Sequence, residues 1–119
     1  MSAIGPGLLV LLGVAEGDDL TQAERLASKV RALRVFDDSD GRMNEPLGDR
    51  ELLCVSQFTL HADVSRGNRP FFGNAAPPEA AQRIYDRFCE HAGAKRGEFG
   101  ARMEVELTAD GPVTIILDA

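Results

Sequence analysis

The chain has 119 residues, 44% of them hydrophobic and 27% charged, with a formal net charge of −6 and a pI of about 4.8. These values predict one soluble globular domain spanning residues 1–119, and no run approaches the roughly 18 apolar residues of a membrane span. The acidic balance argues against a protein held on nucleic acid by phosphate neutralisation alone, but not against one that binds one end of an RNA. The first residues lack the basic segment of a secretory signal, so we expect a cytoplasmic protein.

The first two predicted elements are a strand over residues 7–14 and a helix over residues 20–33. The strand segment is continuously apolar and bounded by glycine, which is typical of a strand buried on both faces. The helical segment has apolar residues at helical spacing. It follows Asp19, an N-cap residue type, and Gln22 occupies the position of a capping-box partner.

Residues 34–48 show weaker patterns of secondary structure. We expect a short strand at 34–36, a turn at 37–41 and irregular chain at 43–48. The turn contains three aspartates, as the start of a calcium loop does, but the glutamate expected at the end of such a loop is not in place. The sequence therefore predicts no metal site in this turn.

Residues 52–60 combine an apolar run with polar residues at its exit. The apolar half predicts a central strand buried on both faces, and Ser56, Gln57 and Thr59 then present hydrogen-bonding groups at the edge of the core. Small-molecule sites in layered α/β proteins are often built at such strand ends. A core strand with a polar cap is the alternative, and the sequence alone leaves both open.

Residues 61–76 form a long stretch without periodicity, and a loop of that length in a compact domain is usually functional or mobile. It carries Arg66 and Arg69 beside Phe71 and Phe72. Charge next to aromatic rings suits a phosphate and a base. It suits equally well a solvated loop anchored by two phenylalanines, and both interpretations remain open.

The second half of the chain predicts one more helix and two more strands. The helix runs from Pro77-Pro78, since proline suits a first helical turn, to Gly93, a helix-ending residue. Residues 101–108 alternate between apolar and charged side chains, which predicts a half-exposed strand, and residues 113–117 predict the last strand. The apolar face of the helix consists of Ala81, Ile84, Tyr85, Phe88 and Cys89.

The two cysteines fall inside predicted elements, Cys54 in the central strand and Cys89 in the second helix. This position indicates reduced core thiols of a cytosolic protein. Two cysteines also provide no metal framework.

Few side chains suggest catalysis. Ser56, His61 and Asp63 lack the nucleophile elbow of a serine hydrolase. On a continuing strand, His61 would share a face with Thr59 and could serve as its base, although a surface histidine at a strand end explains it as well. An enzyme of this sequence would have to rely on backbone groups or on the substrate itself.

A series of motifs stands in the order of a known family. They are Gly5 to Val14, Ser56-Gln57-Phe58-Thr59-Leu60, Arg69-Pro70 with Phe72, Asn74 to Pro78, and Phe99-Gly100-Ala101 through Asp110-Gly111-Pro112-Val113-Thr114. From Ile4 to Asp118 the chain resembles the D-aminoacyl-tRNA deacylases, also called D-tyrosyl-tRNA deacylases. The pairing of Ser-Gln-Phe-Thr-Leu with Gly-Pro-Val-Thr is a specific signature.

The resemblance implies an enzyme that hydrolyses the ester linking a D-amino acid, or achiral glycine, to the 3′-terminal adenosine of tRNA. Such an enzyme provides chirality proofreading in translation quality control. It uses no cofactor and no metal, and it has neither DNA nor a membrane as partner. The implied fold is α/β, with a mixed, barrel-like sheet and two packed helices, assembled as a homodimer with each site at the interface.

The resemblance also implies roles for particular residues. Gly111-Pro112 has a cis bond and reaches into the partner's site, where its backbone oxygens occupy the place of an L side chain. Backbone N–H groups near Phe58 and Thr59 act as oxyanion donors, and the substrate's own ribose hydroxyl assists the chemistry. The expected catalytic residues are Ser56, Gln57, Phe58 and Thr59, the chirality-selective pair is Gly111 and Pro112, and the substrate- and tRNA-binding residues are Arg66, Arg69, Phe72 and Met103.

Three departures from the family pattern bear on activity. The family's N-terminal β-hairpin, with an arginine that supports the Gly-Pro loop, does not precede Ile4. Ala109 stands where an asparagine is common, and Phe71 stands where a small polar residue is usual. An alternative function is therefore a module that keeps the fold and the dimer and binds tRNA ends or amino acids without turnover. A side-chain hydrolase of another class is a third hypothesis.

Overall fold

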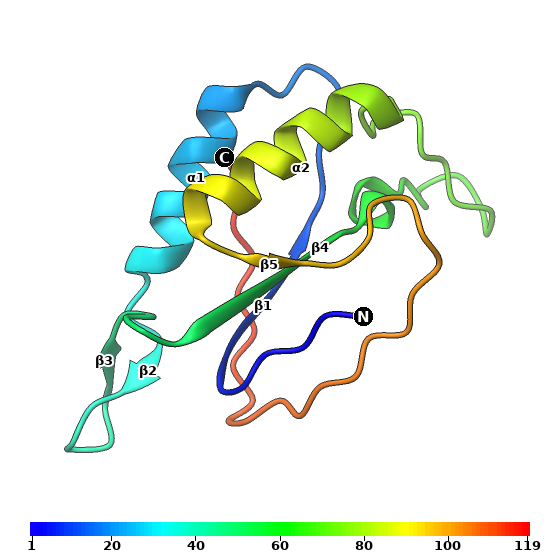
Figure 1. Cartoon of the computed structure of the whole chain (residues 1–119). Coiled ribbons are helices and arrows are strands. Elements are labelled where there is room, and N and C mark those ends of the chain that lie inside the picture. Colours follow the sequence, from blue (N-terminus) through cyan, green and yellow to red (C-terminus); the bar gives the residue numbers. More distant parts are fainter.

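The structure is a computed structural model that describes all 119 residues (Figure 1). A short 3-10 helix, η1, follows the central strand. The elements in chain order are β1 (Gly7–Leu12), α1 (Leu20–Ala32), β2 (Phe36–Asp37), β3 (Met43–Glu45), β4 (Glu51–Ser56), η1 (Phe58–His61), α2 (Pro78–Ala92) and β5 (Lys95–Arg96).

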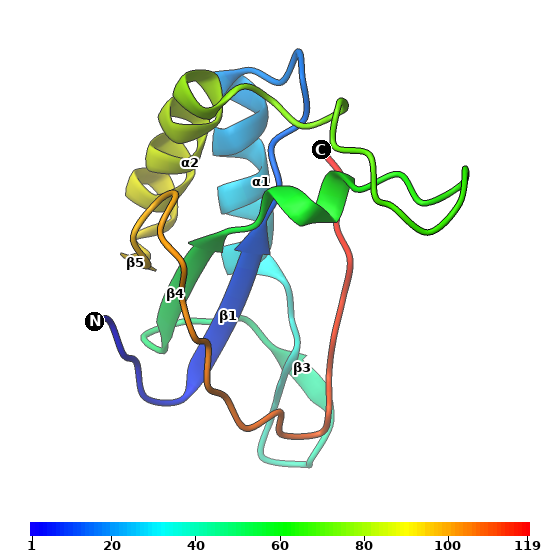
Figure 2. The same ribbon diagram turned by 90° about the vertical axis from the view of Figure 1, so that its right-hand side faces the viewer.

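The main sheet has three parallel strands in the order β1-β4-β5. Parallel neighbours need a crossover connection, and the two crossovers contain α1 and α2, which pack against each other on one face of the sheet (Figure 1, Figure 2). β2 and β3 form a separate antiparallel hairpin. The predicted α/β fold with two packed helices is confirmed, while the single mixed sheet is found instead as a parallel sheet and a hairpin.

Both helices form where the sequence predicts them, and each has one end with a clear capping motif. The Asp19 carboxylate accepts the Gln22 N–H at 2.8 Å, and the Gln22 side-chain oxygen accepts the Asp19 N–H at 2.7 Å. This reciprocal pair is the capping box. At the other end of the helical layer, Gly93 adopts a left-handed conformation (φ +67°) that closes α2.

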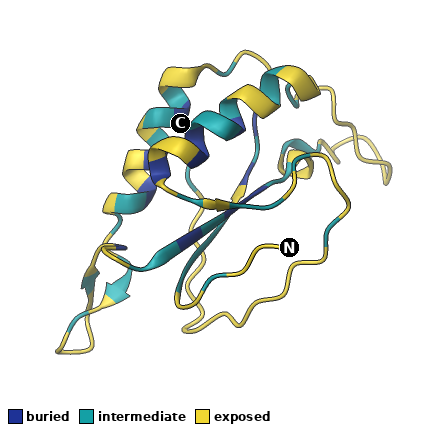
Figure 3. Ribbon diagram, viewed as in Figure 1, coloured by how far each residue is buried: buried dark blue, intermediate teal, exposed yellow.

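The core lies between the two helices and the sheet (Figure 3). Thirteen of the 119 residues are buried, and none of the buried residues is charged. The Tyr85 hydroxyl donates a hydrogen bond to the Cys54 carbonyl oxygen at 2.8 Å, which ties α2 to β4. The prediction that the first strand is buried on both faces is wrong, since Leu11 is 45% exposed. The helices cover only one side of the sheet.

The cysteines are buried, reduced thiols, as the sequence indicates. A hydrogen bond between the Cys54 and Cys89 thiols, together with burial, raises the pKa of Cys54 above its ordinary value. Cys54 therefore stays protonated and packs as a small apolar residue.

The two strands predicted at residues 101–108 and 113–117 do not form. The chain after β5 runs as extended backbone to the end of the molecule where β1 begins, and then returns to the C-terminus (Figure 2). Alternation shows which side chains share a face, but a strand also needs a neighbour that supplies hydrogen bonds. Leu107, Ile115 and Ile116 are 59%, 50% and 87% exposed along this segment.

Residues 36–45, where we expected one short strand, a turn and irregular chain, form the β2–β3 hairpin. The short strand lies at Phe36–Asp37, and β3 forms inside the segment expected to be irregular. Between them, the Asp38 carboxylate accepts N–H groups of Arg42 and Asp40 at 3.0 and 2.9 Å, which lowers the pKa of Asp38. The acidic turn thus uses its carboxylate to close a hairpin.

None of the helices combines the length and apolar character needed to cross a membrane.

Candidate active site at the end of the central strands

η1 begins where β1 and β4 stop pairing. The Gln57 N–H donates to the Leu12 carbonyl oxygen at 2.8 Å, and the chain then turns, with the Leu60 N–H donating to the Gln57 carbonyl oxygen at 3.3 Å. β4 therefore ends at Ser56, and the chain does not continue as a strand through Thr59 and His61. β1 ends at Leu12, so no neighbouring strand remains for β4 to extend along.

The start of η1 presents backbone donors. The first N–H groups of a helix have no acceptor within it, and in η1 these belong to Phe58 and Thr59. Gln57 provides no side-chain cap to this helix. Its amide instead donates to the Thr59 hydroxyl oxygen. The neighbouring Ser56 ends β4 opposite Leu12 and is half-buried.

His61 does not extend a catalytic side-chain set. Its ring lies over the backbone of Gly13, where a Cβ atom would come within 3.1 Å of Cδ2 and Nε2. The Asp63 carboxylate accepts the Ser65 hydroxyl at 2.6 Å and the Ser65 N–H at 2.9 Å, which lowers the pKa of Asp63. The strand geometry on which a Thr59–His61 pair depended is absent.

An aromatic pair connects η1 to the long loop. The Phe58 and Phe72 rings meet edge to face, with centroids 5.0 Å apart and an interplanar angle of 69°. Phe58 is 56% and Phe72 37% exposed, so the pair forms an apolar surface beside the η1 donors. This contact brings two of the sequence-predicted site residues together.

The loop is tied at both ends. Asp63 bridges Phe71 in antiparallel fashion, and Ala75 bridges Ala15 after β1. Arg66 and Arg69 lie between Asp63 and Phe71, and both are exposed and outside any ion pair. Their positive charges therefore remain free for an anionic ligand.

Met103 lies at the same end of the sheet. Its sulfur would be 2.9 Å from a Cβ atom on Gly97, and Val55 of β4 lies next to the same point. The contact holds the thioether near the exit of the central strand and explains why Met103 is half-buried in an otherwise exposed segment.

The Gly111-Pro112 bond is cis, as the resemblance implied, and Gly111 has φ +124°. Both residues are exposed. The segment that carries them turns at the end of the molecule where β1 begins, whereas η1 lies where β1 and β4 end (Figure 1, Figure 2). One chain therefore does not bring Gly111-Pro112 and the η1 residues together.

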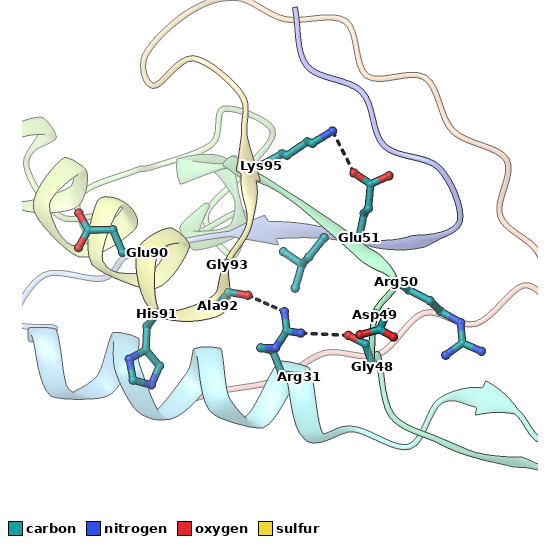
Figure 4. A pocket seen from close by; sticks show the side chains of 11 residues that line it. Arg31, Gly48, Asp49, Arg50, Glu51, Glu90, His91, Ala92, Gly93 and Lys95 are labelled. Atoms are coloured by element: carbon teal, nitrogen blue, oxygen red, sulfur yellow. Dashed lines mark hydrogen bonds and ion pairs between the residues drawn. The ribbon is translucent and has the colours of Figure 1, made fainter.

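A cavity of about 490 Å³ lies away from all of these residues (Figure 4). At its centre the Arg31 guanidinium donates to the Ala92 carbonyl oxygen at 2.7 Å and to the Gly48 carbonyl oxygen at 3.1 Å. On its rim Lys95 pairs with Glu51 at 2.9 Å. These charged groups are occupied by structural contacts that join the ends of α1, α2 and β4. No group of three or more His, Cys, Asp or Glu side chains is arranged to hold a metal ion.

Sequence reasoning missed the part played by residues 12–16, which contact both η1 and the end of the long loop. The only sequence signal was Gly13, which served merely to mark the end of the predicted apolar run.

The chain is similar to a known protein family along nearly its whole length. The sequence profile of the family described as D-Tyr-tRNA(Tyr) deacylase matches residues 1–118. Proteins named D-aminoacyl-tRNA deacylase from Dehalococcoides mccartyi and Thermomicrobium roseum are 56% and 51% identical to the chain. These alignments cover 98% and 100% of this chain and 80% and 82% of those proteins.

A solved structure supports the fold. A protein named c-Myc DNA Unwinding Element Binding Protein superposes with a TM-score of 0.92 at 41% identity, over 100% of this chain and 86% of that one. The profile match and the identities of 50% or more over nearly the whole chain decide the assignment. The chain belongs to the D-aminoacyl-tRNA deacylase family of hydrolases.

Proposed function

We propose that the site at η1 hydrolyses the ester bond of D-aminoacyl-tRNA, and of glycyl-tRNA, with the Phe58 and Thr59 N–H groups as oxyanion donors. The observation that carries this assignment is the pair of backbone N–H donors at the start of η1. The Thr59 hydroxyl beside them accepts a hydrogen bond from the Gln57 amide and has no general base to take its proton. Donors aimed at developing negative charge are often the largest single contribution to catalysis. Such a site needs no side-chain nucleophile.

The reaction proceeds by addition of water to the ester carbonyl. As the water oxygen bonds to the carbonyl carbon, the carbonyl oxygen becomes an oxyanion next to the two N–H groups. The ester C–O bond then breaks, and the ribose oxygen leaves with a proton derived from the water. The neighbouring ribose hydroxyl of the substrate assists this proton transfer, and the products are free amino acid and tRNA.

In this proposal the 3′-terminal adenosine end of tRNA lies along residues 61–76, which we call the arginine loop. Arg66 and Arg69 are exposed, unpaired cations, and the Phe58–Phe72 surface offers a ring for a base to stack on. Met103 provides an adaptable apolar contact on the other side. The proposal includes a cytoplasmic location, with neither DNA nor a membrane as a partner.

The proposal includes a homodimer in which each site uses two chains and the sheet closes towards a barrel. Gly111-Pro112 of one subunit would enter the partner's η1 site and reject L-aminoacyl groups by backbone contact. Two observations support this arrangement: the separation of the two motifs within one chain, and the exposure of Val105, Leu107 and Ile115 on a segment without a covering layer. The single domain of residues 1–119 is the repeating unit.

The test is deacylation of matched D- and L-tyrosyl-tRNA by the purified chain, with glycyl-tRNA as a third substrate. We expect hydrolysis of the D-ester and of glycyl-tRNA well above the spontaneous rate, and no acceleration with the L-ester. Binding of D-tyrosyl-tRNA without turnover would replace the proposal with a non-catalytic module. Equal hydrolysis of both enantiomers would remove the role of Gly111-Pro112.

A further inference from the structure

Residues 12–16, which begin with the last residue of β1, contact both η1 and the end of the arginine loop. The Leu12 carbonyl oxygen accepts the Gln57 N–H at 2.8 Å, which fixes the residue before η1. Two residues later, the Val14 carbonyl oxygen accepts the Ala76 N–H at 2.9 Å, which fixes the end of the arginine loop. The residue between these two anchors is Gly13.

Gly13 is packed so closely against η1 that a Cβ atom would fit only if its neighbours moved by a few tenths of an ångström. A Cβ atom would lie 3.1 Å from the Cβ of Leu60 and 3.1 Å from both Cδ2 and Nε2 of His61. These separations are shorter than the carbon–carbon optimum of about 3.5–4.0 Å. Gly13 does not have a positive φ, so the backbone conformation alone does not require glycine. What requires it is the close approach of η1.

Leu60 and His61 are the last two residues of the four-residue η1, whose first two are the proposed oxyanion donors. A single helical turn has no internal hinge, so a displacement of its second half also moves its first half. The position of the Phe58 and Thr59 N–H groups is therefore set by how closely η1 rests on Gly13.

We propose that Gly13 is a positioning residue for the reaction: because it has no side chain, η1 can rest on the backbone after β1 and aim its N–H groups at the developing oxyanion. This inference rests on the proposed function of the η1 site. It predicts that a single methyl group at position 13 slows the chemical step much more than it weakens tRNA binding, since the loop that carries the arginines is held separately through Val14 and Ala76.

The expected size follows from the geometry. Misplacement of reacting groups by about 1 Å can cost about 100-fold in rate, and a methyl group at Gly13 displaces its neighbours by less than that. We expect Gly13→Ala to lower kcat by about 10- to 100-fold, with KM changed by less than about twofold. General loss of folded protein would also lower the apparent kcat and leave KM unchanged, so each kcat is calculated for the folded fraction alone.

The experiment compares four variants in D-tyrosyl-tRNA hydrolysis, with the folded fraction of each determined by thermal unfolding. Gly5→Ala is the matched control, because a Cβ atom there has no neighbour closer than 3.6 Å. His61→Ala alone is the reference against which the double variant is compared. Gly13→Ala/His61→Ala removes the two ring atoms that the new methyl group meets and leaves only Leu60 close by. In the double variant, the decrease in log kcat should be at most about half of the decrease that Gly13→Ala causes alone.

A structural measurement accompanies the kinetics. In ¹⁵N–¹H spectra, the amide signals of Phe58 and Thr59 should shift in Gly13→Ala, return towards their original positions in the double variant, and stay unchanged in Gly5→Ala, while the Tyr85 amide stays constant in all. A kcat for Gly13→Ala equal to that of Gly5→Ala, or a loss that the double variant does not reverse, overturns the inference. If the unmodified chain hydrolyses no D-aminoacyl-tRNA, the proposed function fails, and the amide shifts alone then decide whether Gly13 sets the position of η1.

Discussion

The Thr59 hydroxyl oxygen accepts a hydrogen bond from the Gln57 amide, and His61 rests on Gly13 instead of turning towards it. A threonine in that setting has no group to take its proton as it attacks. The backbone of the same residue, at the start of η1, is well placed to donate. At this scale the site is defined by N–H groups rather than by side chains.

Thr59→Ala should therefore keep at least about a tenth of the wild-type kcat/KM, because the variant retains the N–H donor. The measurement is steady-state hydrolysis of D-tyrosyl-tRNA. Removal of a true nucleophile costs on the order of a millionfold, and a loss of that size would assign Thr59 the covalent role rejected here.

Phe58→Pro tests the donor itself. Proline is accepted at the first helical position, where it removes the N–H and keeps the turn, and Phe58→Ala removes the same ring while keeping the N–H. We expect the proline variant to have a kcat about 10²- to 10³-fold below that of the alanine variant, the usual effect of losing one oxyanion donor. Equal rates in the two variants, with equal thermal stability, would rule out the Phe58 N–H.

At the scale of the elements, the arginine loop is held by the Asp63–Phe71 and Ala15–Ala75 bridges. Its two arginines are exposed and lie between Asp63 and Phe71. The protein as a whole has a net charge of −6. Two unpaired arginines on this loop therefore create a local positive region on an acidic protein.

Replacing both Arg66 and Arg69 by Gln should raise KM and leave kcat nearly unchanged. Each phosphate contact on a single strand releases counterions and contributes about 0.7 to the steepness of the plot of log affinity against log salt, so loss of two contacts should lower the steepness by about 1.4. Arg25→Gln/Arg83→Gln is the matched control, since those two arginines are equally exposed and unpaired but lie on the helices. A salt slope unchanged from wild type would identify Arg66 and Arg69 as solvated loop charges.

The packing of α2 on β4 makes a stability prediction. Tyr85→Phe should lower the free energy of unfolding by about 1 kcal/mol. The cost stays moderate because the Cys54 carbonyl oxygen also accepts the Gly97 N–H at 3.0 Å and keeps a partner. Phe88→Ala, which empties a fully buried position, should cost about 3–5 kcal/mol. Urea unfolding of both variants measures the difference, and equal losses would contradict this account of the core.

The sequence predicted well those elements whose signals are local. The capping box at Asp19 and Gln22 and the closing Gly93 fixed both helices to within a residue. Alternation at residues 101–108 was misleading, because whether a neighbouring strand exists is not encoded in the segment itself. Likewise, residues 58–61 form η1 because β1 ends at Leu12, a long-range cause that periodicity cannot register. The sequence predicted that residues 56–59 belong to a site. It did not predict their backbone geometry or their contact with Gly13.

On the scale of the whole molecule, the two signature motifs lie at opposite ends of the sheet. A site that requires both can then be complete only if a second chain supplies one of them. The proposed dimer follows from this separation, and the same separation provides a way to test it.

Complementation between two inactive variants is the expected outcome. Phe58→Pro removes an η1 donor, and Gly111→Phe fills the partner's site with a ring. In a heterodimer, one site combines the intact η1 of the second variant with the intact Gly111-Pro112 of the first. After subunit exchange at equal amounts, half of the dimers are mixed and each carries one intact site, so activity should return to about a quarter of wild type. Failure to regain activity, although mass spectrometry detects mixed dimers, would mean that each site is built within one chain.

The position of Tyr85 has an optical consequence. The chain contains one tyrosine and no tryptophan, so its near-ultraviolet signal arises chiefly from a phenol that is 1% exposed and hydrogen-bonded inside the core. Intrinsic emission therefore reports on whether α2 is seated on β4 and is insensitive to events at η1 or on the arginine loop. A titration with aminoacyl-tRNA should leave this emission unchanged after correction for absorption by the RNA, and denaturant should change it in a single step together with exposure of the two thiols to a colorimetric reagent.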